Sequence, residues 1–172
     1  MFFRSMKVWI AATVLVALVL AGTAIGVHVT SSTSFCLSCH EMRVHQQELA
    51  LSPHAQDARG NAIECVQCHI PSTNIVSMLS AKTWLGTKDL WVHATTGGSV
   101  TLNRREIQPE ARRFMDDANC RACHEDLYRN AKNDGAISEY GRLAHDNYLD
   151  KNGSSRSGCA GCHRNIAHLP PE

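Results

Sequence analysis

The cysteine and histidine residues of this chain are arranged in four copies of one short pattern. Each copy has two cysteines separated by two residues and followed at once by a histidine, and the copies use all eight cysteines. Cys-x-x-Cys-His is the attachment signal for c-type haem, in which the thiols bond to the macrocycle and the histidine reaches the iron. The pattern therefore predicts four covalently bound haem c groups. The attachment residues are Cys36, Cys39 and His40; Cys65, Cys68 and His69; Cys120, Cys123 and His124; and Cys159, Cys162 and His163.

Two other uses of eight cysteines are weaker interpretations. Four disulfides would suit a secreted scaffold, and two Cys₄ zinc sites would suit paired C-x-x-C motifs. Neither explains why a histidine follows every second cysteine. The repeated histidine therefore favours haem.

Each haem iron has a second axial position, which a His or Met can fill or which can remain open. Six histidines lie outside the motifs, and beside four irons a neutral imidazole is a preferred ligand. His168 follows the last motif by five residues, too close to reach the opposite face of its own haem, so we expect it to serve a neighbouring one. Met42, two residues after His40, is a candidate thioether ligand of the first haem; the alternative is that it only packs beside the haem edge.

One apolar segment precedes all four motifs. Residues 8–27 carry no charge and follow Arg4 and Lys7, so they are long enough for a membrane-spanning helix with the positive flank in the cytoplasm. A cleaved signal peptide is the alternative, because Gly22-Thr23-Ala24 resembles a cleavage site, but its apolar region would be shorter. We therefore expect a cytoplasmic stub and anchor at 1–29 and a periplasmic haem domain at 30–172, in the inner membrane.

The part after the anchor is expected to be mainly α-helical, with little regular sheet. The chain is only 6% aromatic, so the macrocycles must supply most of the buried apolar surface of this small domain. A helix is predicted at 72–93, a short helix at 109–117, and loops at 30–34, 95–99 and 152–158. On the longest helix Lys82, Asp89 and His93 share one face, and Trp84 and Trp91 share another. The indoles suggest a helix near the bilayer; the alternative is a solvated helix with two core tryptophans.

Formal net charge excludes one class of partner. Lys+Arg of 17 against Asp+Glu of 16 gives +1, which is not the basic excess of a protein that binds nucleic acid.

Taken together, the anchor, the four motifs, the extended first motif FCLSCHEMR and the ending CHRNIAHLP resemble the NapC/NirT/NrfH family of membrane-anchored tetrahaem cytochromes. Both segments are more similar to the NapC/NirT branch. The resemblance implies that Met42 ligates haem 1 in place of His40. It also implies distal ligands, with His54 for haem 4, His168 for haem 3 and His145 for haem 2.

For function, the resemblance implies a quinol dehydrogenase that passes electrons from menaquinol or ubiquinol to a periplasmic reductase or soluble cytochrome in anaerobic-type respiration. The quinol site would include Lys82 and Asp89, with Asp89 as proton acceptor; Asp89 and His93 could also form a proton relay. Two rival functions remain open from the residues. The chain could reduce quinone with electrons from a periplasmic oxidation, or it could reduce an oxyanion at an open haem.

Overall fold

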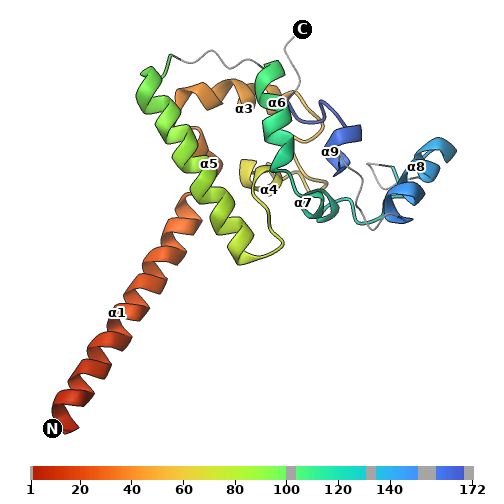
Figure 1. Ribbon diagram of the computed structural model, residues 1–172. Helices are drawn as coiled ribbons and strands as arrows, with labels where there is room; N and C mark the ends of the chain where they lie inside the picture. The colour runs from red at the N-terminus through yellow and green to blue at the C-terminus, as the bar shows by residue number, and fades with distance from the viewer. Residues whose placement is uncertain (1, 100–103, 131–134, 151–157, 169–172) are drawn as a thin grey trace.

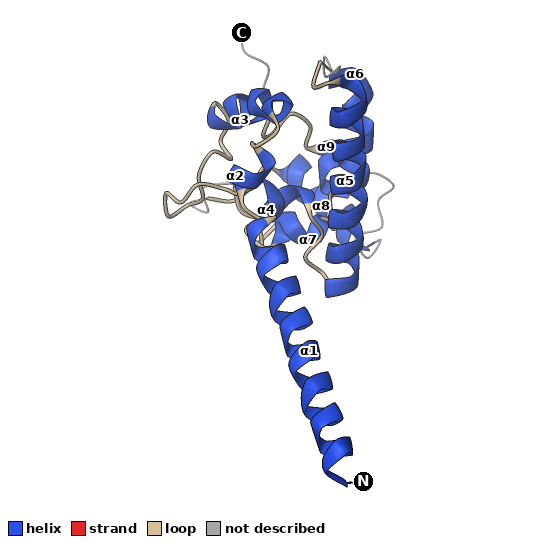
Figure 2. Ribbon diagram, turned by 90° about the vertical axis from the view of Figure 1, so that its left-hand side faces the viewer, coloured by secondary structure: helices blue, strands red, loops and turns tan. Residues whose placement is uncertain are grey.

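The computed structural model describes residues 2–99, 104–130, 135–150 and 158–168. Within these ranges the regular elements are all helices, and the only β-type pairings are two isolated bridges, Gln56 with Ala62 and Arg129 with Ala136 (Figure 2). The predicted mainly α-helical class is confirmed. The loop expected at 152–158 lies almost entirely outside the described residues.

The first helix, α1 (Phe2–Val29), extends away from the rest of the molecule as a single rod (Figure 1). Its segment Met6–Val29 has a mean hydropathy of 2.4, and none of it is buried by the remainder of the chain. Apolar side chains that face outward all around a helix of this length are typical of a membrane span. The predicted anchor is therefore present as one continuous helix.

Four short helices carry the first cysteine of each motif: α2 (Thr33–Cys36), α4 (Cys65–His69), α7 (Asp117–Arg121) and α9 (Gly158–Cys162). Local side chains explain where three of them begin. Ser32 caps α2 by accepting from the Phe35 N–H, Glu64 and Gln67 form a reciprocal capping box on α4, and Asp116 accepts from the Ala118 N–H at the start of α7. The polar segment expected as a linker at 30–34 is thus only a turn, and its last two residues already belong to α2.

The longest helix after the anchor is α5 (Ile75–Thr96), close to the predicted 72–93. The Asn74 side chain caps its start by accepting from the Ser77 N–H, and Gly97, at φ 59°, ends it in the left-handed conformation that glycine adopts easily. Both views place α5 beside the end of α1 (Figures 1 and 2).

The remaining elements are a 3₁₀ turn (His40–Met42), α3 (Arg43–Ala50), α6 (Arg104–Arg113) and α8 (Glu139–Asp150). The helix predicted at 109–117 begins earlier and ends earlier, with Pro109 inside α6 rather than at its start. Proline lacks the N–H that an interior position would donate, so its placement there is less favourable than at a first turn.

Side chains of the protein alone form a very small core. Among the described residues, only Leu49 and Ala81 are buried hydrophobics, and the buried polar residues are Glu48 and Ser52. The motif helices contact one another in chain order, α2 with α4, α4 with α7 and α7 with α9. The fold therefore holds the four motifs in a continuous series and provides little else as an interior.

Candidate functional site

The eight motif cysteines lie in a series of neighbouring pairs. All are free thiols, which removes the disulfide interpretation. The thiols of Cys36 and Cys65 hydrogen-bond to each other, as do those of Cys120 and Cys159. Among the described residues, no group of three or more cysteines converges on a point where it could hold one metal ion, so the zinc interpretation has no support either.

Each motif histidine has one histidine from outside the motifs beside it. The ring centres are 6.0 Å apart for His40 and His93, 5.9 Å for His69 and His168, 6.0 Å for His124 and His54, and 6.0 Å for His163 and His145. Two imidazoles bound to opposite sides of one metal ion, at metal–nitrogen distances of about 2 Å, place their ring centres about 6 Å apart. The donor groups therefore fit a bis-histidine haem at each of the last three motifs.

Backbone carbonyls set the tautomer of the three predicted distal histidines. The Nδ1–H of His54 donates to the Ile166 carbonyl at 3.0 Å, that of His145 to the Leu127 carbonyl at 2.5 Å, and that of His168 to the His45 carbonyl at 3.0 Å. A carbonyl can only accept, so Nδ1 carries the proton and Nε2 keeps the lone pair that a metal requires. Burial, with His168 and His45 nearby, also lowers the pKa of His69 to about 4, which favours its neutral form.

The pairing differs from the one implied by family resemblance. The structure places His54 beside the third motif rather than the fourth, His168 beside the second rather than the third, and His145 beside the fourth rather than the second. The reason is long-range packing: the residues that follow the last motif fold back over 42–54, so His168 and His54 are positioned by chain segments more than a hundred residues away.

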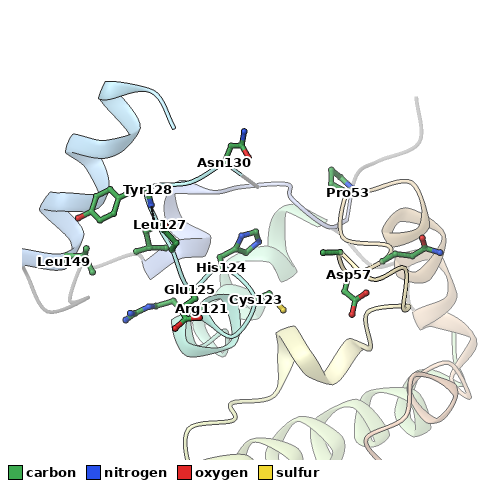
Figure 3. Close-up of a pocket in the computed structure, with 13 residues that line it drawn as sticks. Pro53, Asp57, Arg121, Cys123, His124, Glu125, Leu127, Tyr128, Asn130 and Leu149 are labelled. Carbon is green, nitrogen blue, oxygen red and sulfur yellow. Dashed lines mark hydrogen bonds between the residues drawn. The ribbon is translucent and has the colours of Figure 1, made fainter. Parts of the chain in front are cut away.

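A cavity of about 970 Å³ surrounds the third motif (Figure 3). Its volume is in the range of a cofactor site. In the close-up, the His124 ring lies in the middle, with Pro53 and Asp57 on one side and Leu127 and Tyr128 on the other. The cavity thus lies between two separate segments of the chain at the place where the third haem attaches.

The first motif is arranged differently from the other three. The Nε2–H of His40 donates to the Gly98 carbonyl at 2.9 Å, so the nitrogen that a motif histidine offers to iron is already engaged. The Nδ1–H of His93 donates to a carboxylate oxygen of Glu41 at 2.7 Å, rather than to a backbone carbonyl. Gly98 has φ +73°, and a Cβ there would come within 2.6 Å of the His40 ring, so a residue without a side chain is required.

The two predicted quinol residues lie on α5 at different positions relative to the anchor. Lys82 Nζ donates to the Val27 carbonyl at 3.1 Å and to Ser31 Oγ at 2.6 Å, so it joins α5 to the end of α1. Burial lowers its pKa, while Cys36 opposes the shift. The Asp89 side chain is 58% exposed and lies 4.0 Å from Lys88; desolvation raises its pKa and Lys88 opposes this.

Several contributing residues were not found by sequence reasoning. Glu41 lies inside the extended first motif and could have been noticed as a charged neighbour of Met42. Buried Glu48, whose Oε2 is 3.4 Å from His45 Nδ1 and 3.9 Å from His168 Nδ1, carried no such signal. The backbone carbonyls that orient the distal histidines have none either, because any residue supplies a carbonyl.

An anchor helix followed by four covalent haem sites defines this chain as a membrane-anchored multihaem cytochrome c. The sequence profile of the NapC/NirT cytochrome c family, N-terminal region, matches residues 2–172. The chain belongs to the NapC/NirT cytochrome c family, and it binds four haem c groups through its eight cysteines.

Individual relatives agree with this assignment. The tetraheme c-type cytochrome CymA of Shewanella oneidensis is 29% identical over 176 residues, which cover 92% of each chain. The cytochrome c-type protein TorY of Escherichia coli O157:H7 is 33% identical over 84% of this chain, but the match spans only 39% of TorY. Among solved structures, the crystal structure of the cytochrome c nitrite reductase NrfHA complex bound to the HQNO inhibitor contains a chain with a TM-score of 0.55 and 25% identity, covering 93% of this chain and 89% of that one.

Proposed function

We propose that this cytochrome oxidises membrane quinol and passes the electrons to a periplasmic reductase or soluble cytochrome. The observation that carries the proposal is the arrangement of the haem-binding segments: they contact one another in the order α2, α4, α7, α9, and α2 begins four residues after the end of the membrane helix. A series of one-electron carriers that starts at a membrane suits a lipid-soluble donor at one end and a water-soluble acceptor at the other.

The topology proposed is a cytoplasmic stub and anchor at 1–29 and a periplasmic haem domain at 30–172, in the cytoplasmic membrane. Arg4 and Lys7 precede the apolar segment, and positive residues favour the cytoplasmic side. The haem domain would then be on the side where quinol-derived electrons can reach periplasmic partners. The crystallised complex that this fold resembles contains a nitrite reductase, which supports a reductase as the class of partner.

For the axial ligands we propose His69 with His168 at the second haem, His124 with His54 at the third, and His163 with His145 at the fourth. The matching ring separations and the tautomers set by backbone carbonyls support these three pairs. At the first haem we propose Met42, because the Nε2–H of His40 donates to Gly98 and leaves no lone pair on that nitrogen. A thioether at one haem and imidazoles at the others would give that haem a higher reduction potential.

Quinol oxidation releases two protons as well as two electrons, and the proposed proton acceptor is Asp89. Its carboxyl is partly desolvated, which raises the pKa and brings it closer to the neutral range where a group can both accept and release a proton. Lys82 uses two of its three N–H donors on Val27 and Ser31, and the third can reach a quinol oxygen. The haem supplies the one-electron acceptor, and these two side chains supply hydrogen bonding and proton transfer.

The direct test is reduction of the purified, fully loaded protein by a menaquinol analogue, followed through the haem absorbance bands. In Asp89→Asn we expect all four haems to be retained and the rate of reduction to fall by roughly 10²–10⁴-fold, the usual contribution of a positioned general base. Asp150→Asn is the matched control, because it removes the same charge from the end of α8, far from the anchor (Figure 1). Normal turnover in Asp89→Asn would remove Asp89 from the mechanism, and failure of the native protein to be reduced would remove quinol oxidation itself.

A further inference from the structure

One face of α5 is exposed along the helix and has no charged residue. Val76, Trp84, Leu90 and Trp91 are 69%, 59%, 66% and 70% exposed. Spacings of seven place Val76 above Leu90 and Trp84 above Trp91, as successive pairs of turns. Hydroxyl and small side chains fill the positions between them. We call this surface the uncharged α5 face; its members are Val76, Ser80, Thr83, Trp84, Thr87, Leu90, Trp91 and Ala94.

The charged residues of the helix lie elsewhere on its circumference. Lys82 and Asp89 are on the side opposite the uncharged α5 face, and Lys88 is at its edge. Ala81, which is buried, marks the side that packs against the haem domain. A helix that only faced water would normally expose its charges and bury its tryptophans, so this distribution indicates that something other than water covers the exposed face.

The position of α5 identifies what covers it. The bonds from Lys82 to Val27 and Ser31 fix α5 to the last turn of the membrane helix. Figure 1 shows α5 inclined to the axis of α1, with the motif helices on one side of α5 and α1 leaving from the other side. Because the uncharged α5 face is opposite Ala81, it is directed away from the motif helices, toward the side from which α1 extends.

The length of the span places this contact at the level of the lipid headgroups. Met6–Val29 has 24 residues, which rise about 36 Å as a helix, whereas the hydrocarbon core is about 30 Å thick. The last turn of α1 therefore emerges among the headgroups, and Lys82 contacts it there. Trp84 follows two residues later, and indole is a side chain enriched at this interface.

We propose that α5 rests on the bilayer surface, with the uncharged α5 face in the headgroup layer, as a second membrane contact in addition to α1. Tryptophans beside serine and threonine hydroxyls match a layer that has both apolar and hydrogen-bonding components. Lipid is favoured over a second copy of the chain because the face continues directly from the membrane helix. The proposal does not depend on quinol oxidation, since it concerns only where the helix lies.

Photochemical labelling from the lipid tests this proposal. The full-length, haem-loaded protein is placed in phosphatidylcholine vesicles that contain a diazirine-bearing phospholipid, and the carbene adducts are located by mass spectrometry. We expect adducts in the α5 segment around Trp84 and Trp91, severalfold above those on α8. Helix α8 is the internal control, because Tyr140 and Leu143 are 86% and 52% exposed on a helix remote from the anchor (Figure 1).

Two variants sharpen the result. Trp91→Lys should lower labelling of α5 severalfold, because a charge is introduced into the lipid-facing surface, while Tyr140→Lys should leave it unchanged; unaltered haem spectra confirm that both fold. Adducts confined to α1, or equal labelling of α5 and α8, would overturn the proposal. Chain-to-chain crosslinks through α5 without lipid adducts would overturn it in favour of a second copy. None of these readouts requires quinol turnover, so a failure here is separable from a failure of the proposed function.

Discussion

The junction between α1 and α5 can be perturbed with a predictable magnitude, because two hydrogen bonds from one ammonium group hold it. Lys82 donates to the Val27 carbonyl at 3.1 Å and to Ser31 Oγ at 2.6 Å. Hydrogen bonds to charged groups contribute about 1.5–3 kcal/mol each, and the partly exposed position of Lys82 favours the lower value. Lys82→Met keeps the apolar stem and removes both bonds, so we expect a loss of about 3 kcal/mol, or roughly 100-fold in the docking equilibrium. Ser31→Ala removes only the shorter bond and should cost about 1.5 kcal/mol, or roughly tenfold.

Hydrogen–deuterium exchange of the fully loaded protein in nanodiscs measures this equilibrium. Exchange at residues 27–36 should accelerate in proportion to opening of the junction, in the order native, Ser31→Ala, Lys82→Met. Lys88→Met is the matched control, because Lys88 lies on the same helix and contacts only Asp89, at 4.0 Å. Native exchange rates in Lys82→Met, or equal acceleration in Lys88→Met, would refute this account of the junction.

The same pair of variants separates two roles of Lys82. If the lysine acts by positioning α5, quinol oxidation should decline in both variants, in the same order as the exchange rates. If it acts only through a quinol oxygen, Ser31→Ala should retain native turnover while Lys82→Met loses it. Comparison of the two rates therefore assigns the role.

Three further predictions concern the carboxylates and a distal ligand. Because desolvation raises the pKa of Asp89, quinol oxidation should increase with pH through a point above the usual range of an aspartate, and Asp89→Asn should abolish that rise; a native pH profile in the variant would contradict the assignment. His54→Ala should convert one of four haems to high spin, visible by electron paramagnetic resonance, while four low-spin or unchanged signals would show that His124 has another partner. Asp117 accepts from the Cys159 N–H at 2.7 Å and the Tyr148 hydroxyl at 2.9 Å, so Asp117→Ala should lower the free energy of unfolding by about 2–3 kcal/mol in a denaturant titration, and an unchanged midpoint would refute its importance.

Local patterns predicted what local structure determines. The motifs, the apolar span and the helix from Asn74 to Gly97 are each defined by residues within a few positions, and all appear in the structure. The set of histidines beside the motif histidines was also predictable, because few residue types can bind iron. His93, which lies 6.0 Å from His40, had no predicted place there.

The order in which distal histidines meet haems could not be obtained the same way. His54 is oriented by a carbonyl at Ile166, and His168 by a carbonyl at His45, so their partners depend on how the end of the chain folds over its beginning. Such contacts leave no periodicity or spacing in the sequence. The role of Lys82 as a tie to the anchor escaped prediction for the same reason, since one of its acceptors is a backbone carbonyl.

The small protein core has a consequence for the amount of this cytochrome in a cell. With only Leu49 and Ala81 as buried hydrophobics among the described residues, the polypeptide gains little stability from its own side chains. Ligands that bind only the folded state supply the remainder, and covalent attachment makes that supply permanent. The abundance of the mature protein should therefore follow iron availability and the capacity of the haem-attachment machinery, and chains that miss an attachment step should be removed by proteases rather than accumulate.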